Sequence, residues 1–155
     1  MKPAFLLATV LALSSAVLAA DKAANPRAAA ENYVAAALGG KVDDAIALAV
    51  PGQSPGKKEK IDEFRTLIAA KAVKLPTVWA DAKTGRAVAV SEMVKIAQAN
   101  AGTQEGCLVF ALVKTGDKWL IKDIDFRTED KANEQVDKFK TKNADAKEVP
   151  PKAGA

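Results

Sequence analysis

The chain of 155 residues contains no histidine and a single cysteine, Cys107. Without histidine, neither a zinc or copper site of the usual ligand kinds nor a serine-histidine triad can be assembled. One cysteine also excludes an intramolecular disulfide. Because Cys107 stands in an apolar, strand-like run with no histidine to activate it, we expect a buried structural role for its thiol. The sequence therefore predicts no catalytic residue, no metal site and no cofactor.

Long apolar runs are lacking after the first 20 residues. The N-terminus combines Lys2, an apolar stretch over 4–13 and small residues up to Ala19 and Ala20, which is the order of a cleavable signal peptide. Cleavage after either alanine fits this order. The alternative is a membrane anchor, but the stretch is shorter than the about 20 apolar residues that span a bilayer. We expect a periplasmic or secreted protein with no membrane insertion after cleavage.

The chain also lacks a large excess of charge of one sign, and it has few large core side chains. The chain has 23 lysine and arginine residues against 19 aspartate and glutamate residues, and basic residues cluster only over 57–60. This balance favours solubility over nucleic-acid binding. Apolar residues make up 49% of the chain, but alanine alone supplies 33 residues and aromatics only 5%. We expect one domain with a modest core.

Helical periodicity is present in the N-terminal half. A first helix is expected over 26–38, because Asn25 and Pro26 supply an N-cap and a proline at the first helical position. A second, short helix is expected over 42–49, between a pair of glycines and a proline. After a loop, apolar residues at helical spacing predict a third helix that ends near residue 72.

Valine-rich alternation then predicts four strands, over 73–82, 86–97, 107–114 and 118–126, joined by short turns as an antiparallel meander. The alternation places Val88, Val90, Val94 and Ile96 on one face of the second strand. In the fourth strand it pairs Trp119 with Ile121 on one face and sets Leu120, Ile124 and Phe126 on the other. The expected class is α+β, with three N-terminal helices covering one face of a four-stranded antiparallel sheet.

The composition becomes highly charged beyond residue 127. A helix that starts near Thr128 would have only Val136 and Phe139 as large apolar residues, so we expect it to be marginal and loosely docked. The last dozen residues lack the apolar surface that offsets ordering entropy, and we expect them to be disordered. The chain is thus expected to comprise a signal peptide (1–20), one α+β domain (21–127) and a charged tail (128–155).

The few aromatic residues and two strand carboxylates are the candidates for a site. A pocket between helices and sheet is the functional interpretation, and a filled hydrophobic core is its alternative. The candidate pocket residues are Tyr33, Phe64, Trp79, Glu92, Phe110, Trp119 and Asp123. Asp123 and Asp125 are expected on the same face of the last strand, where they would seat acid and base groups, hold a calcium ion or form a solvated edge.

Three segments carry a resemblance to a known family. These are the stretch from Asn25 to Val34, the stretch GGKVDDAI over 39–46 and the stretch KTGDKWLIKDID over 114–125. They resemble the nuclear transport factor 2-like superfamily, particularly its exported bacterial members. The resemblance implies a cystatin-like cone, in which helices pack in the concave face of a curved antiparallel sheet, often as a dimer and often with a pocket at the open end.

Some members of that superfamily are enzymes whose pockets use an acidic base with tyrosines or histidines. This chain has no histidine, and its one tyrosine, Tyr33, is at a core-facing helical position. No catalytic residue therefore carries over. Proton-transfer catalysis needs a base and a donor that converge on one substrate atom, so the departure favours binding.

Three functions remain open at this point. The leading hypothesis is a non-enzymatic exported domain that binds a small apolar or amphipathic ligand, or a partner protein, through the cavity or the sheet face. The first alternative is an isomerase or hydro-lyase-type enzyme with a buried carboxylate base, for which Glu92 and Asp123 are the candidates. The second is a structural homodimer in which the free sheet face is buried against a second copy.

Overall fold

The computed structural model describes residues 24–152, so the expected signal peptide lies outside the described residues. The described chain confirms the α+β class, with an antiparallel sheet between helices. None of its helices is long and apolar enough to cross a bilayer. The helices are α2 (Pro26–Leu38), α3 (Val42–Ala47), a single 3-10 turn (Ser54–Gly56), α4 (Lys58–Leu67) and α5 (Glu129–Lys142). The strands are β1 (Thr77–Asp81), β2 (Arg86–Gln98), β3 (Gly102–Thr115), β4 (Lys118–Arg127) and β5 (Lys147–Glu148).

The first and third helices show how local sequence sets their bounds. Asn25 caps α2, because its side-chain oxygen accepts a hydrogen bond from the backbone nitrogen of Ala28 at 2.8 Å. The third helix, α4, ends at Leu67, earlier than expected. Ile68 leaves the helical conformation and forms a bridge with Ile96 of β2, so pairing with the sheet ends the helix.

The sheet has five strands in the order β4-β3-β2-β1-β5, which corrects the four expected. The fifth strand comes from the tail for which composition predicts disorder. Lys147 and Glu148 pair with β1, and the backbone nitrogen of Val149 donates to the carbonyl of Val78 at 2.8 Å. This segment is held by backbone pairing with β1 and by the hydrogen bond from Arg27 to the carbonyl of Val149. Neither interaction can be inferred from composition.

Two β-bulges change which face each strand presents, and both overturn expected face assignments. In β2 the register shifts between Val90 and Met93, so Val88 and Val90 face one layer while Val94 and Ile96 face the other. Ser91 fills the interruption, because its hydroxyl accepts from the nitrogen of Leu108 and donates to the carbonyl of Glu92. An extra residue reverses side-chain alternation beyond it and bends the strand.

The second bulge lies in the β3–β4 pairing, where Ala111 pairs with Asp123 but Leu112 pairs with Ile121. The shift brings Ile124 and Phe126 to the layer that Trp119 and Ile121 already occupy, contrary to the strict alternation expected. This layer is the main core, between the sheet and α2, α3 and α4. The bulge therefore directs the end of β4 toward α4.

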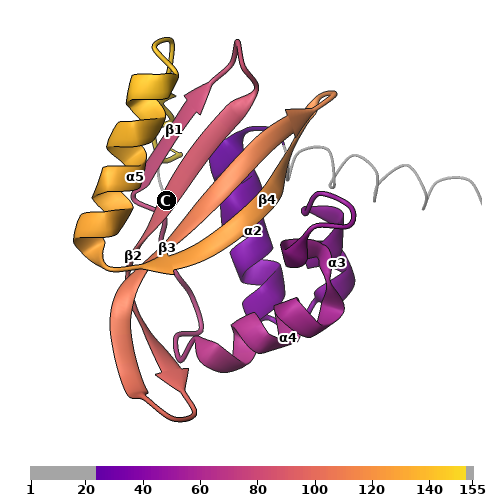
Figure 1. The fold of residues 1–155 in the computed structure, drawn as a ribbon. Helices are drawn as coiled ribbons and strands as arrows, with labels where there is room; N and C mark the ends of the chain where they lie inside the picture. Colours follow the sequence, from indigo (N-terminus) through magenta and orange to yellow (C-terminus); the bar gives the residue numbers. More distant parts are fainter. Residues whose placement is uncertain (1–23, 153–155) are drawn as a thin grey trace, which may run out of the picture.

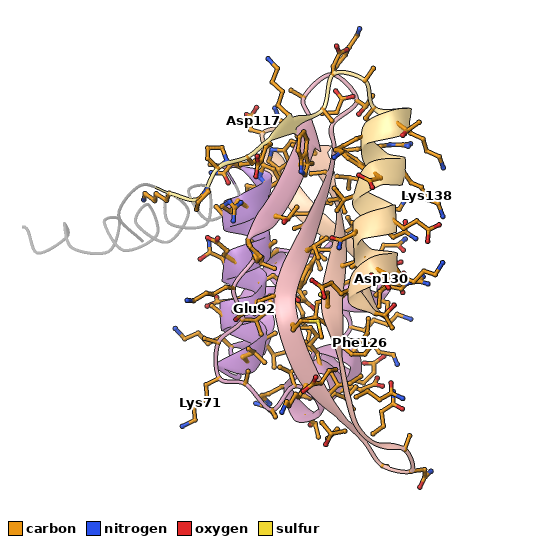
Figure 2. All side chains as sticks on the ribbon, turned by 90° about the vertical axis from the view of Figure 1, so that its left-hand side faces the viewer. Lys71, Glu92, Asp117, Phe126, Asp130 and Lys138 are labelled. Atoms are coloured by element: carbon orange, nitrogen blue, oxygen red, sulfur yellow. The ribbon has the colours of Figure 1, made fainter. Side chains whose placement is uncertain are left out.

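Helices cover both faces of the sheet, not one. In Figure 1 α2, α3 and α4 lie on one side and α5 lies on the other, and Figure 2 shows the sheet between α2 and α5. The helix α5 is not marginal, because Ala132 is fully buried and Val136 is buried beside it. These two residues belong to a second apolar cluster that also contains Val88, Val90, Cys107 and Val109.

The end of α5 is fixed by polar contacts. The side-chain nitrogen of Asn143 donates to the carbonyl of Phe139 at 2.8 Å, and its oxygen accepts from the hydroxyl of Thr84 in the β1–β2 turn at 3.1 Å. The ammonium of Lys140 lies 4.8 Å from the ring centre of Trp79. These contacts join the helix to the first hairpin and explain how a highly charged helix docks with few apolar residues.

Candidate ligand-binding pocket

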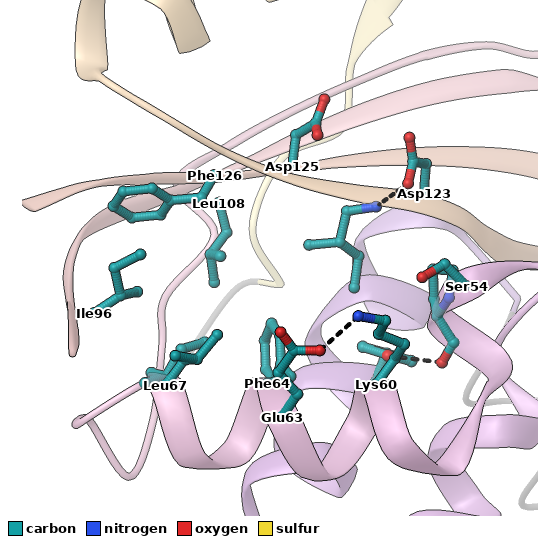
Figure 3. A pocket seen from close by; sticks show the side chains of 14 residues that line it. Ser54, Lys60, Glu63, Phe64, Leu67, Ile96, Leu108, Asp123, Asp125 and Phe126 are labelled. Carbon is teal, nitrogen blue, oxygen red and sulfur yellow. Dashed lines mark hydrogen bonds and ion pairs between the residues drawn. The ribbon is translucent and has the colours of Figure 1, made fainter. Parts of the chain in front are cut away.

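A cavity of about 260 Å³ opens between α4, the loop with the 3-10 turn and the second half of β4 (Figure 3). Its walls come from the main core layer and its mouth carries charged side chains. The lining residues are Tyr33, Ser54, Pro55, Lys60, Glu63, Phe64, Leu67, Ile68, Ile96, Leu108, Asp123, Ile124, Asp125 and Phe126. The pocket therefore combines an apolar interior with a polar opening, as ligand sites commonly do.

Two aromatic rings form the helical wall. Tyr33 of α2 and Phe64 of α4 meet edge to face, with ring centres 6.1 Å apart and planes at 74°. The hydroxyl of Tyr33 donates to the carbonyl of Pro55 at 2.8 Å. Burial raises the pKa of Tyr33 to about 12, so the phenol is neutral at physiological pH. Its proton is already committed to the loop carbonyl.

The sheet wall depends on a close approach at Gly106. A Cβ atom added there would lie 2.7 Å from Cζ of Phe126 and 2.5 Å from the carbonyl oxygen of Arg127. Contacts that short do not occur between real Cβ atoms and their neighbours. The missing side chain lets β4 lie close to β3 and lets the Phe126 ring lie against the backbone, where it borders the pocket beside Leu108.

Charged residues stand on both sides of the mouth. On α4, Lys60 and Glu63 form an ion pair at 2.6 Å, and both side chains are about half exposed. The hydrogen bond to Glu63 raises the pKa of Lys60, which stays cationic. On β4, Figure 3 shows Asp123 and Asp125 projecting from the side of the strand that faces away from α4. The carboxylates therefore border the opening and do not enter the apolar interior.

The structure brings together three of the seven predicted pocket residues: Tyr33, Phe64 and Asp123. Phe110 and Trp119 are buried in the main core and do not line the cavity. These two residues therefore belong to a filled hydrophobic core, which was the alternative to a pocket. Trp79 packs in the layer under α5, on the opposite face of the sheet, because β1 turns that side chain away from the main core.

Glu92 lies outside the pocket and has a different task. Its carboxylate accepts a hydrogen bond from the backbone nitrogen of Lys74 at 3.0 Å, while its own backbone nitrogen donates to the carbonyl of Lys74 at 2.9 Å. These hydrogen bonds hold the segment before β1 against β2. Glu92 and Asp123 do not line the same pocket.

Several lining residues escape a reading of the sequence. Ile124 and Phe126 reach the pocket because the β4 bulge reverses alternation, and no turn residue marks that bulge. Lys60 and Glu63 are visible in the sequence as charges three residues apart on one helix, a spacing typical of a solvated helical face. The signal that locates this pocket is therefore the bulge, which only the strand pairing reveals.

The pocket's chemistry suits binding. Among residues 24–152, no group of three or more histidine, cysteine, aspartate or glutamate side chains is placed to hold a metal ion. The tyrosine hydroxyl is engaged with Pro55, and the carboxylates of Asp123 and Asp125 lie on the outer side of β4. An apolar body fits the interior, and a polar head group would meet Lys60 and the carboxylates at the mouth.

No protein-family model and no curated protein matches the chain. Among solved structures, it is similar to a SEC-C motif containing protein from Rhodopseudomonas palustris, with 12% identity, a TM-score of 0.51 and coverage of 66% of this chain and 78% of that chain. At that identity the likeness concerns the fold alone. A calcium/calmodulin dependent protein kinase II association domain protein from Xanthomonas campestris aligns with 18% identity over 81% of this chain and 93% of that one, but its TM-score of 0.40 is too low to carry an argument.

Proposed function

We propose that the chain is an exported, cone-like domain of the nuclear transport factor 2-like kind that binds a small amphipathic molecule in the pocket between α4 and β4. The observation that carries the proposal is the pocket itself, with Tyr33, Phe64, Leu108 and Phe126 around an apolar interior and charges only at the mouth. The packing of α2, α3 and α4 against one face of a sheet with two bulges supports the cone.

The size of the pocket supports a small ligand. A volume of about 260 Å³ lies just below the about 300–1,000 Å³ that is usual for sites of drug-sized ligands. A chain of about six carbons with one polar head suits such a space. Small ligands gain little free energy per atom, so a dissociation constant on the order of 1 mM is expected for a simple probe.

Binding also accounts for the pocket better than proton transfer does. A catalytic base and a proton donor must both reach the same substrate atom. Here the phenol of Tyr33 is neutral and donates to Pro55, and Glu63 is paired with Lys60. The enzyme alternative would need Asp123 to turn from the outer side of β4 into the interior.

An NMR titration of ¹⁵N-labelled protein with 1-hexanol tests the proposal. Saturable shifts of backbone amides are expected around the pocket, at Phe64, Leu108 and Phe126. The blocking variant is Leu67→Trp, which puts a larger side chain at a half-buried lining position. Its matched control is Leu120→Trp, which makes the same change at a half-buried position of β4 outside the lining.

Two outcomes oppose the binding proposal. The first is the absence of any saturable shift in the unmodified protein. The second is equal binding by Leu67→Trp and Leu120→Trp, because a ligand in this pocket must compete with the tryptophan at position 67. The expected result is loss of hexanol shifts in Leu67→Trp alone, with both variants unfolding at similar temperatures.

Export is tested separately, by the N-terminal sequence of the protein recovered from the envelope or the medium. The proposal expects a mature chain that begins at Ala20 or Asp21, because cleavage is predicted after Ala19 or Ala20. A protein that keeps Met1 and stays in the cytoplasm would contradict export while leaving the pocket untouched.

A further inference from the structure

The charges around the pocket mouth do not follow the balance of the whole chain. Basic residues outnumber acidic ones by 23 to 19 overall. Of the four charged residues that line the pocket, however, three are acidic: Glu63, Asp123 and Asp125, against Lys60 alone. The mouth is thus an acidic spot on a basic protein.

Pairing within the protein satisfies most of these charges but not all. Glu63 pairs with Lys60 at 2.6 Å, and Asp125 pairs with Arg127 at 2.9 Å. Asp123 accepts the backbone nitrogen of Ile124 at 3.0 Å and forms no ion pair among residues 24–152, although the charge of Arg127 also acts on it. Counting Arg127 with the lining residues, three negative charges face two positive ones, so one negative charge is in excess at the mouth.

We propose that the pocket selects amphipathic ligands with a cationic, ammonium-type head group, held with the apolar body against Phe64, Leu108 and Phe126 and the head at the mouth beside Asp123. This rests on the proposed binding function and names the class of ligand. An anionic head of the same length meets the same excess negative charge and is disfavoured. A neutral head group of the same length is intermediate.

The preference should be modest because the mouth is open to water. Exposed charge pairs are screened by solvent and salt. We expect binding of hexylammonium to be about threefold tighter than that of 1-hexanol and about tenfold tighter than that of hexanoate at low salt, which is the scale of one exposed ion pair gained or opposed. Added salt at about 1 M, where the screening length is about 3 Å, should reduce both ratios toward one.

NMR titrations of the purified protein at pH 7 and low salt, with hexylammonium, 1-hexanol and hexanoate, test the inference. The charge variant is Asp123→Asn, which keeps an oxygen for the Ile124 nitrogen while removing the charge. Its matched control is Asp117→Asn in the β3–β4 turn, which Figure 2 labels at the opposite end of the sheet from Phe126. Asp123→Asn should weaken hexylammonium about threefold more than it weakens 1-hexanol, and Asp117→Asn should change the binding of neither probe.

The outcomes separate this inference from the binding proposal on which it rests. If 1-hexanol binds in the pocket but the three probes bind equally, or hexanoate binds best, the cationic preference is overturned and the binding function stands. If Asp123→Asn and Asp117→Asn weaken hexylammonium to the same degree, the head group does not sit beside Asp123 and the inference is overturned. If none of the three probes binds, the binding proposal itself fails.

Discussion

Arg27, in the first turn of α2, should be the side chain whose truncation costs the domain most stability outside its apolar core. The residue is 4% exposed, and its guanidinium donates to three backbone carbonyls from two distant segments: Leu75 and Pro76 before β1, and Val149 after β5. Nε and Nη2 reach the oxygen of Val149 at 3.0 and 2.7 Å. The side chain thereby joins the first helix to the segment before β1 and to the segment after β5, which lie side by side at the start of β1.

The magnitude follows from what Arg27→Ala leaves behind. A hydrogen bond to a charged group contributes about 1.5–3 kcal/mol, and the contributions of bonds that share one group do not add fully. Water can reach some of the freed carbonyls, so we expect a loss of about 3–5 kcal/mol in the free energy of unfolding. For a domain of this size that corresponds to a fall in Tm of roughly 10–20 °C.

Urea unfolding followed by tryptophan fluorescence measures the loss, with two companion variants. Arg27→Lys keeps the charge but not the planar set of donors, and should lose about half as much. Arg65→Ala removes an exposed arginine that is paired with Asp62 at 3.1 Å, and should change stability by less than about 1 kcal/mol. Amide exchange at Val149 should also accelerate in Arg27→Ala. A loss no larger than that of Arg65→Ala would refute the role assigned to this guanidinium.

Three further predictions concern single positions. Gly106→Ala should destabilise the domain by about 1–3 kcal/mol and abolish 1-hexanol binding, because the new Cβ displaces the Phe126 ring. Thermal unfolding measures the loss of stability and an NMR titration measures the loss of binding, and unchanged 1-hexanol binding would contradict the prediction. Tyr33, the only tyrosine in the sequence, should ionise near pH 12 when the titration is followed by ultraviolet absorbance, and ionisation near pH 10 in the folded protein would contradict its burial. Because its pKa in the folded protein lies above its ordinary value of 10.0, its contribution to stability is present below pH 10 and is lost toward pH 12. The thiol of Cys107 is buried and burial raises its pKa, so alkylation at pH 8 should be on the order of a hundredfold slower than in urea, and equal rates would show that α5 does not cover it.

The helices were the part of the fold that sequence reasoning located best, because their signals are local. Asn25 and Pro26 mark the start of α2 by capping chemistry that involves only the next few residues. The helix α4 ends earlier than its local pattern predicts, because Ile68 forms a β-bridge with Ile96, which is far along the chain. Non-local pairing decided the boundary where the local pattern would have continued the helix.

The two bulges explain most of what the sequence could not reveal about the pocket. Alternation of apolar residues assigns faces correctly only while the strand pairing stays regular. Past Ser91 and past Lys122 each strand gains one residue, and every later side chain changes sides. Tyr33 and Phe64 lie on helices and line the pocket, whereas Trp79 lies on β1 and faces the layer under α5.

The C-terminal segment was misjudged because composition measures only apolar surface. Its order in the structure comes from backbone bonds with Val78, from Arg27 and from the polar contacts of Asn143 with Thr84. Each of these partners is distant in sequence. Such a segment is held by contacts with distant parts of the domain, so its order cannot be predicted from its own residues.

Native mass spectrometry of the protein purified without denaturation from the cells that make it tests the central claim most directly. If the pocket between α4 and β4 is a ligand site, the spectrum should contain the protein with one small bound molecule, retained in Leu120→Trp and lost in Leu67→Trp. A molecule that stays bound to Leu67→Trp as well as to Leu120→Trp would contradict the claim that this pocket holds the ligand.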